Sequence, residues 1–149
     1  MPRVTDNTFS VEKAEDSPGF LLWQVTSLWQ RGIKKALGPF DLTHAQFVLL
    51  ASAYWLTLQK KNVTQVALAD HSRIDPMTTS QVLRTLEEKG FVTRAGHATD
   101  TRAKVITVSE TGKKLVKPAV AAVEKFDREF FSRLGSRGEA FNADLRSLL

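Results

Sequence analysis

The 149-residue sequence contains no cysteine, which excludes disulfide bonds, thiolate metal sites and thiol-based redox sensing. It also lacks a long hydrophobic run. The most apolar stretch, residues 47–58, is interrupted by Ser52 and Thr57 and is too short to span a bilayer. The first residues lack the hydrophobic segment of a secretion signal, so we expect a cytoplasmic protein.

Signatures of common catalytic sites are missing as well. The chain has no G-x-S-x-G, no phosphate-binding loop and no H-E-x-x-H. Its histidines, His44, His71 and His97, are dispersed and lack carboxylate or cysteine companions at ligand spacing. We therefore expect neither an enzyme nor a metal or cofactor site.

Positive charge is in excess, with a formal net charge of +5 at pH 7. Acidic residues dominate the first 16 positions, whereas basic residues outnumber them between Lys60 and Lys104. Such a distribution favours a polyanionic partner over the second segment, although net charge alone does not identify nucleic acid.

Helix start and stop signals divide the chain after a non-periodic arm over residues 1–16. N-capping residues precede the apolar periodic segments at Ser17, Thr43, Thr64, Asp75 and Ser109. Prolines follow the first and fourth of these caps, and a capping box joins the second to Gln46. Helices are predicted over 18–37, 44–59, 65–72, 76–89 and 110–134, and a last one after a second capping box, Ser136-x-x-Glu139.

The spacing of apolar residues predicts which faces of these helices are buried. The helix that begins at residue 44 is apolar on nearly every side, so we expect it to be the most buried. In the next helix, Val66, Ala67 and Leu68 are expected to face inward. In the fourth, Thr79, Val82, Leu83 and Leu86 share one face at 100° per residue.

Between Phe91 and Val108 the hydrophobic period changes from helical to two. The β-branched segments "FVTR" and "AKVITVS", separated by Gly96 and Asp100, predict a hairpin. A short helix, a tight turn, a second helix and then a hairpin is the order of a winged helix-turn-helix. We therefore expect a mainly α fold with a small β-hairpin wing, flanked by N- and C-terminal helices.

The second helix of the pair is narrow enough to enter a major groove and presents small polar side chains there. Its candidate DNA contacts are Pro76, Met77, Thr78, Ser80, Gln81 and Arg84. Ser and Thr can bond several bases, Gln can pair bidentately with adenine, and Arg can reach a phosphate or a guanine. The alternative is an ordinary surface helix with a polar solvent face.

The hairpin connection holds Asp100 and Arg102, two residues apart. An arginine at a hairpin tip beside a groove-reading helix can enter the adjacent minor groove, whose negative potential attracts guanidinium. Asp100 can orient Arg102 through a hydrogen-bonded ion pair. Alternatively, Asp100 only forms the turn and Arg102 is a solvated charge.

The sequence resembles the multiple-antibiotic-resistance regulator (MarR) family of transcription regulators over residues 18–149. The resemblance rests on "LTHAQFVLL", "VTQVALADHSRIDPMTTSQVLRTLEEKGFVTR", D-x-R at 100–102 and "VSETGKKL". It implies a homodimeric repressor of a pseudo-palindromic operator, released by a small, often aromatic or anionic ligand. Residues 76–81 and Arg84 would then read the major groove, and Arg102 the minor groove.

Two positions depart from the family pattern. Members commonly carry a leucine and a glycine in the turn between the helices, where this chain has Ser72 and Arg73, so Arg73 either contacts a phosphate or lies in solvent. Met77 is bulkier than the small residue often found there, so a base preference cannot be carried over.

The flanking segments carry more apolar surface than a small winged domain can cover, which predicts an association site with twofold symmetry. We assign residues 17–40 and 109–149 to dimerisation helices and 41–108 to the DNA-binding domain. The alternative is a compact monomeric bundle. Candidate ligand-pocket residues, which otherwise belong to the core or interface, are Trp23, Trp29, His44 and Tyr54.

A competing function is a winged-helix module that binds another protein and has no specific DNA affinity. The two functions differ in salt dependence, because phosphate contacts make DNA affinity fall steeply as salt rises.

Overall fold

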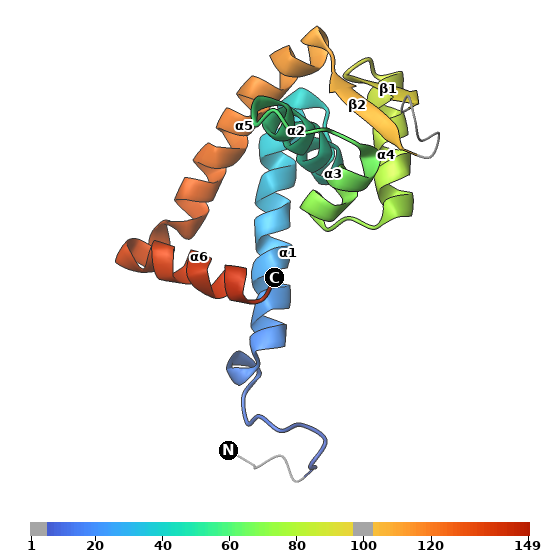
Figure 1. The fold of residues 1–149 in the computed structure, drawn as a ribbon. Coiled ribbons are helices and arrows are strands. Elements are labelled where there is room, and N and C mark those ends of the chain that lie inside the picture. Colours follow the sequence, from blue (N-terminus) through green and yellow to red (C-terminus); the bar gives the residue numbers. More distant parts are fainter. Residues whose placement is uncertain (1–5, 97–102) are drawn as a thin grey trace.

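A computed structural model describes residues 6–96 and 103–149 of the chain (Figure 1). The helices are α1 (Pro18–Leu37), α2 (His44–Leu58), α3 (Gln65–Ser72), α4 (Pro76–Glu88), α5 (Glu110–Phe131) and α6 (Gly138–Ser147). Short 3-10 turns are η1 (Ala14–Asp16), η2 (Gly38–Phe40) and η3 (Ser132–Arg137), and the strands are β1 (Val92–Gly96) and β2 (Lys104–Val108). The expected mainly helical fold with a hairpin wing is confirmed.

Local capping chemistry sets the start of five helices. The side chains of Ser17, Thr43, Thr64, Asp75 and Ser109 each accept a hydrogen bond from the backbone N–H three residues later. Both bonds of the predicted capping box between Thr43 and Gln46 are present. These caps satisfy backbone donors that have no partner inside the helix.

The bounds predicted for the last two helices are partly wrong. α5 ends at Phe131, before the predicted stop at Gly135, which lies inside η3 with a φ of 55°. Because η3 continues to Arg137, the predicted cap Ser136 falls inside it. α6 then begins at Gly138 without a side-chain cap.

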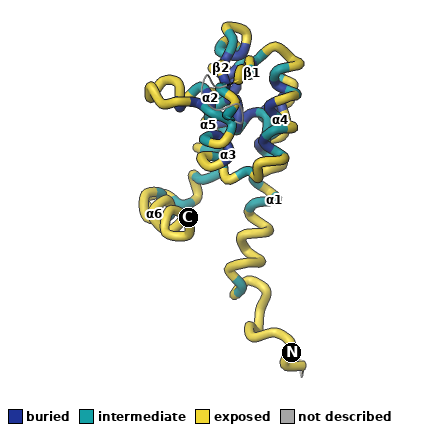
Figure 2. The backbone as a smooth tube through the Cα atoms, turned by 45° about the vertical axis from the view of Figure 1, so that its right-hand side comes forward, coloured by how far each residue is buried: buried dark blue, intermediate teal, exposed yellow. Residues whose placement is uncertain are grey.

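The core lies where α2 meets the elements around it (Figure 2). Fully buried apolar side chains of different helices meet there, among them Ile33, Leu37, Leu49, Leu50, Leu68, Leu83, Leu86 and Val116. The expected burial of Val66 is wrong: its residue is 61% exposed, because α3 turns Leu68 and Ala69 inward instead. The buried face of α4 holds Thr79, Leu83 and Leu86, as its periodicity predicts.

The hairpin is attached to the helices at its base. β1 and β2 are antiparallel, with Val92 opposite Val108 and Gly96 opposite Lys104. Thr64 forms an isolated bridge with Val105, and the Ile106 N–H donates to the Val63 carbonyl at 2.8 Å. The segment that enters α3 therefore holds β2, and we refer to α2, α3, α4 and the hairpin together as the winged unit.

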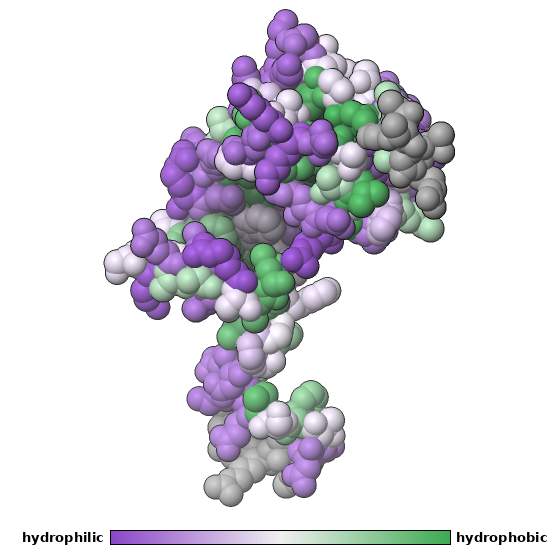
Figure 3. Space-filling view, viewed as in Figure 1, coloured by the Kyte–Doolittle hydropathy of each residue, from purple (hydrophilic) through white to green (hydrophobic). Residues whose placement is uncertain are grey.

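α1 extends far beyond the winged unit (Figure 1). From the end of α5, α6 runs back below the winged unit in the direction of α1. The exposed part of α1 carries large hydrophobic side chains, and Figure 3 shows them below the winged unit. These are Phe20, Leu21, Leu22, Trp23, Val25 and Leu28, and α6 and the residues after it add Leu145, Leu148 and Leu149. Among the described residues, no helix is long and apolar enough to cross a membrane.

Candidate nucleic-acid interface

The orientation of α4 is fixed by contacts on its inner face and at its N-terminus. Asp75 Oδ1 accepts from the Thr78 N–H at 2.8 Å. Hydrogen bonds from the side chain and the backbone of Thr78 lower the pKa of the Asp75 carboxyl. Thr79 is fully buried, and its hydroxyl donates to the Ile74 carbonyl at 3.3 Å. With Leu83 and Leu86 also buried, the opposite face of α4 must point away from the core.

That outer face carries the predicted DNA contacts. Pro76, Met77, Gln81 and Arg84 are exposed, whereas Thr78 and Ser80 are half-buried. Met77 is 73% exposed, so an apolar side chain stands free in the first turn of the helix. An exposed amide, a guanidinium and an apolar group on the same face of one helix suit base edges and thymine methyl groups in a major groove.

Arg73 ends α3 in the left-handed region, with a φ of 61°. This conformation favours glycine, the residue that the resemblance leads one to expect nearby. The exposed guanidinium donates from Nη2 to the Leu149 carbonyl at 3.5 Å, so the turn lies beside the end of the described chain. Arg73 is exposed and lies three residues before the start of α4.

Sequence reasoning missed a polar cluster at the base of the wing. The side chain of Arg94 in β1 is only 9% exposed, and its Nε lies 3.5 Å from Glu87 Oε1 in α4. The Arg94 N–H donates to Glu87 Oε2 at 3.0 Å, and Arg94 Nη1 donates to Gln65 Oε1 at 3.4 Å. The alternation of the strand could have predicted the burial of Arg94, because residues 92 and 94 face the same side of the sheet and Val92 is apolar and buried.

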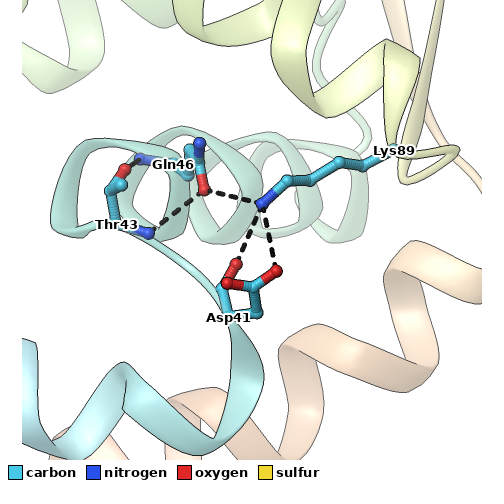
Figure 4. A network of polar contacts seen from close by, with 4 residues as sticks. All are labelled: Asp41, Thr43, Gln46 and Lys89. Carbon is cyan, nitrogen blue, oxygen red and sulfur yellow. Dashed lines mark hydrogen bonds and ion pairs between the residues drawn. The ribbon is translucent and has the colours of Figure 1, made fainter.

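A second cluster holds the same, C-terminal end of α4 against the start of α2 (Figure 4). Lys89 follows the helix, and its ammonium donates to the Asp41 carbonyl at 3.0 Å and to Gln46 Oε1 at 3.4 Å. The Asp41 carboxylate lies 3.8 Å from the same ammonium. Because Gln46 also belongs to the capping box of α2, the end of α4 and the start of α2 share one set of polar contacts.

The predicted wing residues Asp100 and Arg102 lie outside the described residues. Only the base of the wing, up to Gly96 and from Ala103 onward, is therefore described. On this base, the contacts of Arg94 and of Ile106 fix both strands against α3 and α4.

Two of the four predicted ligand-pocket residues come together. The rings of Trp29 and His44 lie edge to face with centroids 5.0 Å apart, and Trp29 Nε1 donates to Asp127 Oδ1 at 2.8 Å. Burial lowers the pKa of His44, and the carboxylate of Asp127 partly opposes this effect. The contact joins α1, α2 and α5 at the border between the long helices and the winged unit.

The other two residues lie apart from this pair. Trp23 is 71% exposed on the free part of α1, and Tyr54 lies half-buried against the core near the end of α2. A cleft of about 610 Å³ opens beside His44, and of the four predicted residues only His44 lines it. Cationic groups stand at this cleft, namely Lys34 and Lys89.

Comparison with known proteins identifies relatives over nearly the whole chain. The sequence model of the MarR family matches residues 42–104, which hold α2, α3, α4 and β1. The uncharacterized HTH-type transcriptional regulator YdcH of Bacillus subtilis is 45% identical over 133 residues, which cover 89% of this chain and 90% of YdcH.

Solved structures share the fold. The Staphylococcus aureus MepR–DNA complex superimposes with a TM-score of 0.80 at 26% identity, covering 89% of this chain and 96% of MepR. CouR from Rhodococcus jostii RHA1, bound to p-coumaroyl-CoA, gives a TM-score of 0.78 at 28% identity, with 93% of each chain covered.

Proposed function

Because this chain belongs to the MarR family of DNA-binding transcription regulators, we propose that it is a homodimeric, ligand-responsive repressor of a pseudo-palindromic operator. The observation that carries the proposal is the exposed outer face of α4, a helix that is capped by Asp75 at its start and held by Glu87 and Lys89 at its end, beside a hairpin. We assign its place of action to the cytoplasm, where the operator DNA is found.

The major-groove contacts are assigned to the outer face of α4 between Pro76 and Arg84. Gln81 and Arg84 supply the side chains that can recognise adenine and guanine, while Met77 can contact a thymine methyl group. Arg73 is assigned to a phosphate, because it is exposed and lies in the turn directly before α4. Asp75 orients the helix end through its cap, and Arg102 is assigned to the minor groove.

Dimerisation is assigned to α1, α5 and α6. The exposed hydrophobic residues of α1 surround the helix over at least two turns, and a monomer leaves them in contact with water. A twofold pairing through this face gives two α4 helices related by the symmetry of a palindromic site. The MepR–DNA complex supports the DNA-binding half of this assignment.

Ligand response is assigned to the border between α1, α2 and α5. The cleft beside His44 offers the imidazole ring and the ammonium of Lys34, which suit an anionic aromatic molecule, while the ammonium of Lys89 there is paired with Asp41. That CouR binds p-coumaroyl-CoA supports a ligand site in a protein of this fold. A ligand that favours one spacing of the two α4 helices then shifts DNA affinity.

The test is fluorescence anisotropy with duplex DNA from the region upstream of the gene and with a scrambled duplex, across a salt series. We expect tight binding to the upstream duplex, weak binding to the scramble and a steep fall of affinity with salt. Absence of duplex binding even at low salt contradicts the proposal and favours the protein-interaction module.

The sign of regulation is tested separately, with a reporter placed behind the bound upstream region. Repression predicts higher reporter expression when the regulator is deleted and a return to low expression when it is restored. Lower expression after deletion contradicts repression but leaves DNA binding intact.

A further inference from the structure

Among the described residues, two groups of exposed hydrophobic side chains and the single Val66 remain after the proposed dimer helices and the DNA face are set aside. One is on the winged unit, at the end of α2, where Trp55 and Leu58 are 55% and 57% exposed. The other is on the N-terminal segment before α1, where Phe9 is 75% exposed and Val11 is 37% exposed. Neither group takes part in the contacts assigned above.

The first group forms a surface that we call the α2 patch, made of Trp55, Leu58, Lys60 and Lys61. Trp55 and Leu58 lie three residues apart and therefore share one face of the helix. Lys60 and Lys61 are held directly after it, because their N–H groups donate to the carbonyls of Thr57 and Leu56. The patch thus combines two large apolar side chains with two exposed ammonium groups.

The composition of α2 indicates that this patch is covered in the working protein. α2 is apolar on nearly every side, a pattern typical of a helix that is surrounded by protein. Its other faces are indeed buried by Phe47, Leu49, Leu50, Ala53 and Leu56. Only at its C-terminal end do large apolar side chains stand in solvent.

The second group has the complementary chemistry. We call residues 6–16 the arm, and its charged residues are Asp6, Glu12, Glu15 and Asp16, with Lys13 as the only cation. Apolar Phe9 and Val11 lie between the first two of these carboxylates. An acidic segment with exposed apolar side chains matches a basic patch with exposed apolar side chains in both charge and hydrophobicity.

The arm cannot reach the α2 patch of its own chain through α1. The C-terminal end of α1 is anchored in the winged unit by the buried Ile33 and Leu37, and the arm leaves from the opposite end (Figure 1). The 20 residues of α1 separate the two ends by about 30 Å. We therefore assign the arm to the partner: if the two α1 helices of the proposed dimer pair antiparallel, the N-terminal end of each lies towards the winged unit of the other.

We propose that the arm of each subunit docks on the α2 patch of the other subunit, with Phe9 and Val11 against Trp55 and Leu58 and the acidic residues facing Lys60 and Lys61. This contact rests on the proposed homodimer and adds to it. It ties the position of α1 in one subunit directly to the winged unit of the other, so it makes the spacing of the two α4 helices sensitive to the arm.

The absence of native cysteine allows a direct test by disulfide cross-linking. Phe9→Cys in one tagged subunit and Leu58→Cys in a differently tagged subunit are co-expressed, and the purified dimers are mildly oxidised. We expect a covalent heterodimer on a non-reducing gel, which only an arm on the partner can give. The matched control pairs Phe9→Cys with Met77→Cys, an exposed position on α4 outside the patch.

The expected result is at least ten-fold more heterodimer for the Leu58→Cys pair than for the Met77→Cys pair. Equal yields, or none with Leu58→Cys, overturn the docking while light scattering still reports a dimer. A wild-type chain that is monomeric by light scattering overturns the proposed dimer itself, so the two failures are distinguishable.

A charge reversal provides a second measurement that does not depend on the reactivity of one cysteine pair. Lys60→Glu with Lys61→Glu is expected to lower the Phe9–Leu58 cross-link several-fold. Adding Asp6→Lys and Glu12→Lys to the arm is expected to restore it. An unchanged cross-linking yield in both sets of variants contradicts the charge complementarity on which the proposal rests.

Discussion

The carboxylate of Glu87 binds Arg94 twice: Oε2 accepts from the Arg94 N–H at 3.0 Å, and Oε1 lies 3.5 Å from Nε of the same residue. A single side chain of the recognition helix thus holds the first strand of the wing by its backbone and by its side chain. Although Arg94 is basic and close to the proposed DNA face, its burial removes it from the surface that can meet phosphate.

Arg94→Met is expected to lower the free energy of unfolding by about 1–3 kcal/mol, because it removes a charge-assisted pair that is buried on the arginine side only. Arg94→Lys keeps the charge but cannot reach both Glu87 and Gln65, so it should recover only part of the loss. Urea unfolding of the two variants measures this. A Met variant as stable as the wild type contradicts a structural role for the cluster.

Gly112→Ala is expected to destabilise the protein although it lies in a helix, where alanine is usually favoured. A Cβ at Gly112 would stand 2.2 Å from the backbone oxygen of Phe91, so α5 and β1 must separate at a cost of about 1–3 kcal/mol. Gly32→Ala is the comparison, because the atoms nearest to its Cβ belong to the ring of Phe126, a side chain, and not to a backbone. A smaller loss for Gly112→Ala than for Gly32→Ala in thermal unfolding contradicts this reading.

Stability is expected to fall as the pH is lowered from 7.5 to 5.5. Burial places the pKa of folded His44 below the ordinary value of about 6.5. Its contribution is therefore complete above that value and is lost as the pH falls through the folded pKa. His44→Phe, which keeps an aromatic ring beside Trp29, should flatten the dependence of unfolding free energy on pH. An unchanged slope in the variant assigns the effect to other groups.

Gln81→Ala is expected to change the preference between operator sequences more than the overall affinity, because a glutamine amide recognises adenine edges. Anisotropy on a set of duplexes with single base-pair changes measures this preference. Uniform weakening across the set instead assigns Gln81 to the DNA backbone.

Arg102→Ala is expected to weaken binding by about 1–3 kcal/mol, with the largest effect at sites flanked by A·T pairs, whose narrow minor groove attracts guanidinium. The comparison uses two duplexes that differ only in their flanks. Equal loss on both, or no loss, removes the minor-groove assignment of this residue.

Features that depend on neighbouring residues were predictable from the sequence. Caps such as Ser17 and Asp75 act within one turn of their own helix, so a few residues suffice to recognise them. The hairpin was equally clear, because β-branched alternation is a local pattern. The helical spacing of apolar residues predicted which face of α4 is buried, and the remaining face was therefore predicted to be exposed.

Features set by distant residues were not predictable in the same way. Val66 is apolar yet faces solvent, because it is Leu68 and Ala69 that α3 buries in the core. Arg94 is charged yet buried, because Glu87 and Gln65 approach it from two other elements. The hydrogen bond of Trp29 to Asp127 joins residues 98 positions apart, which no local pattern reveals.

The close approach of Gly112 to the Phe91 carbonyl has a mechanical meaning. The Ser109 hydroxyl, which caps α5, also donates to the Gly90 carbonyl, so the first turn of α5 and the base of the wing move as one rigid piece. α5 then acts as a lever of 22 residues, about 33 Å long. A tilt of a few degrees at the dimer end therefore moves the wing by a few ångströms, which is enough to make or break its contacts with a DNA groove.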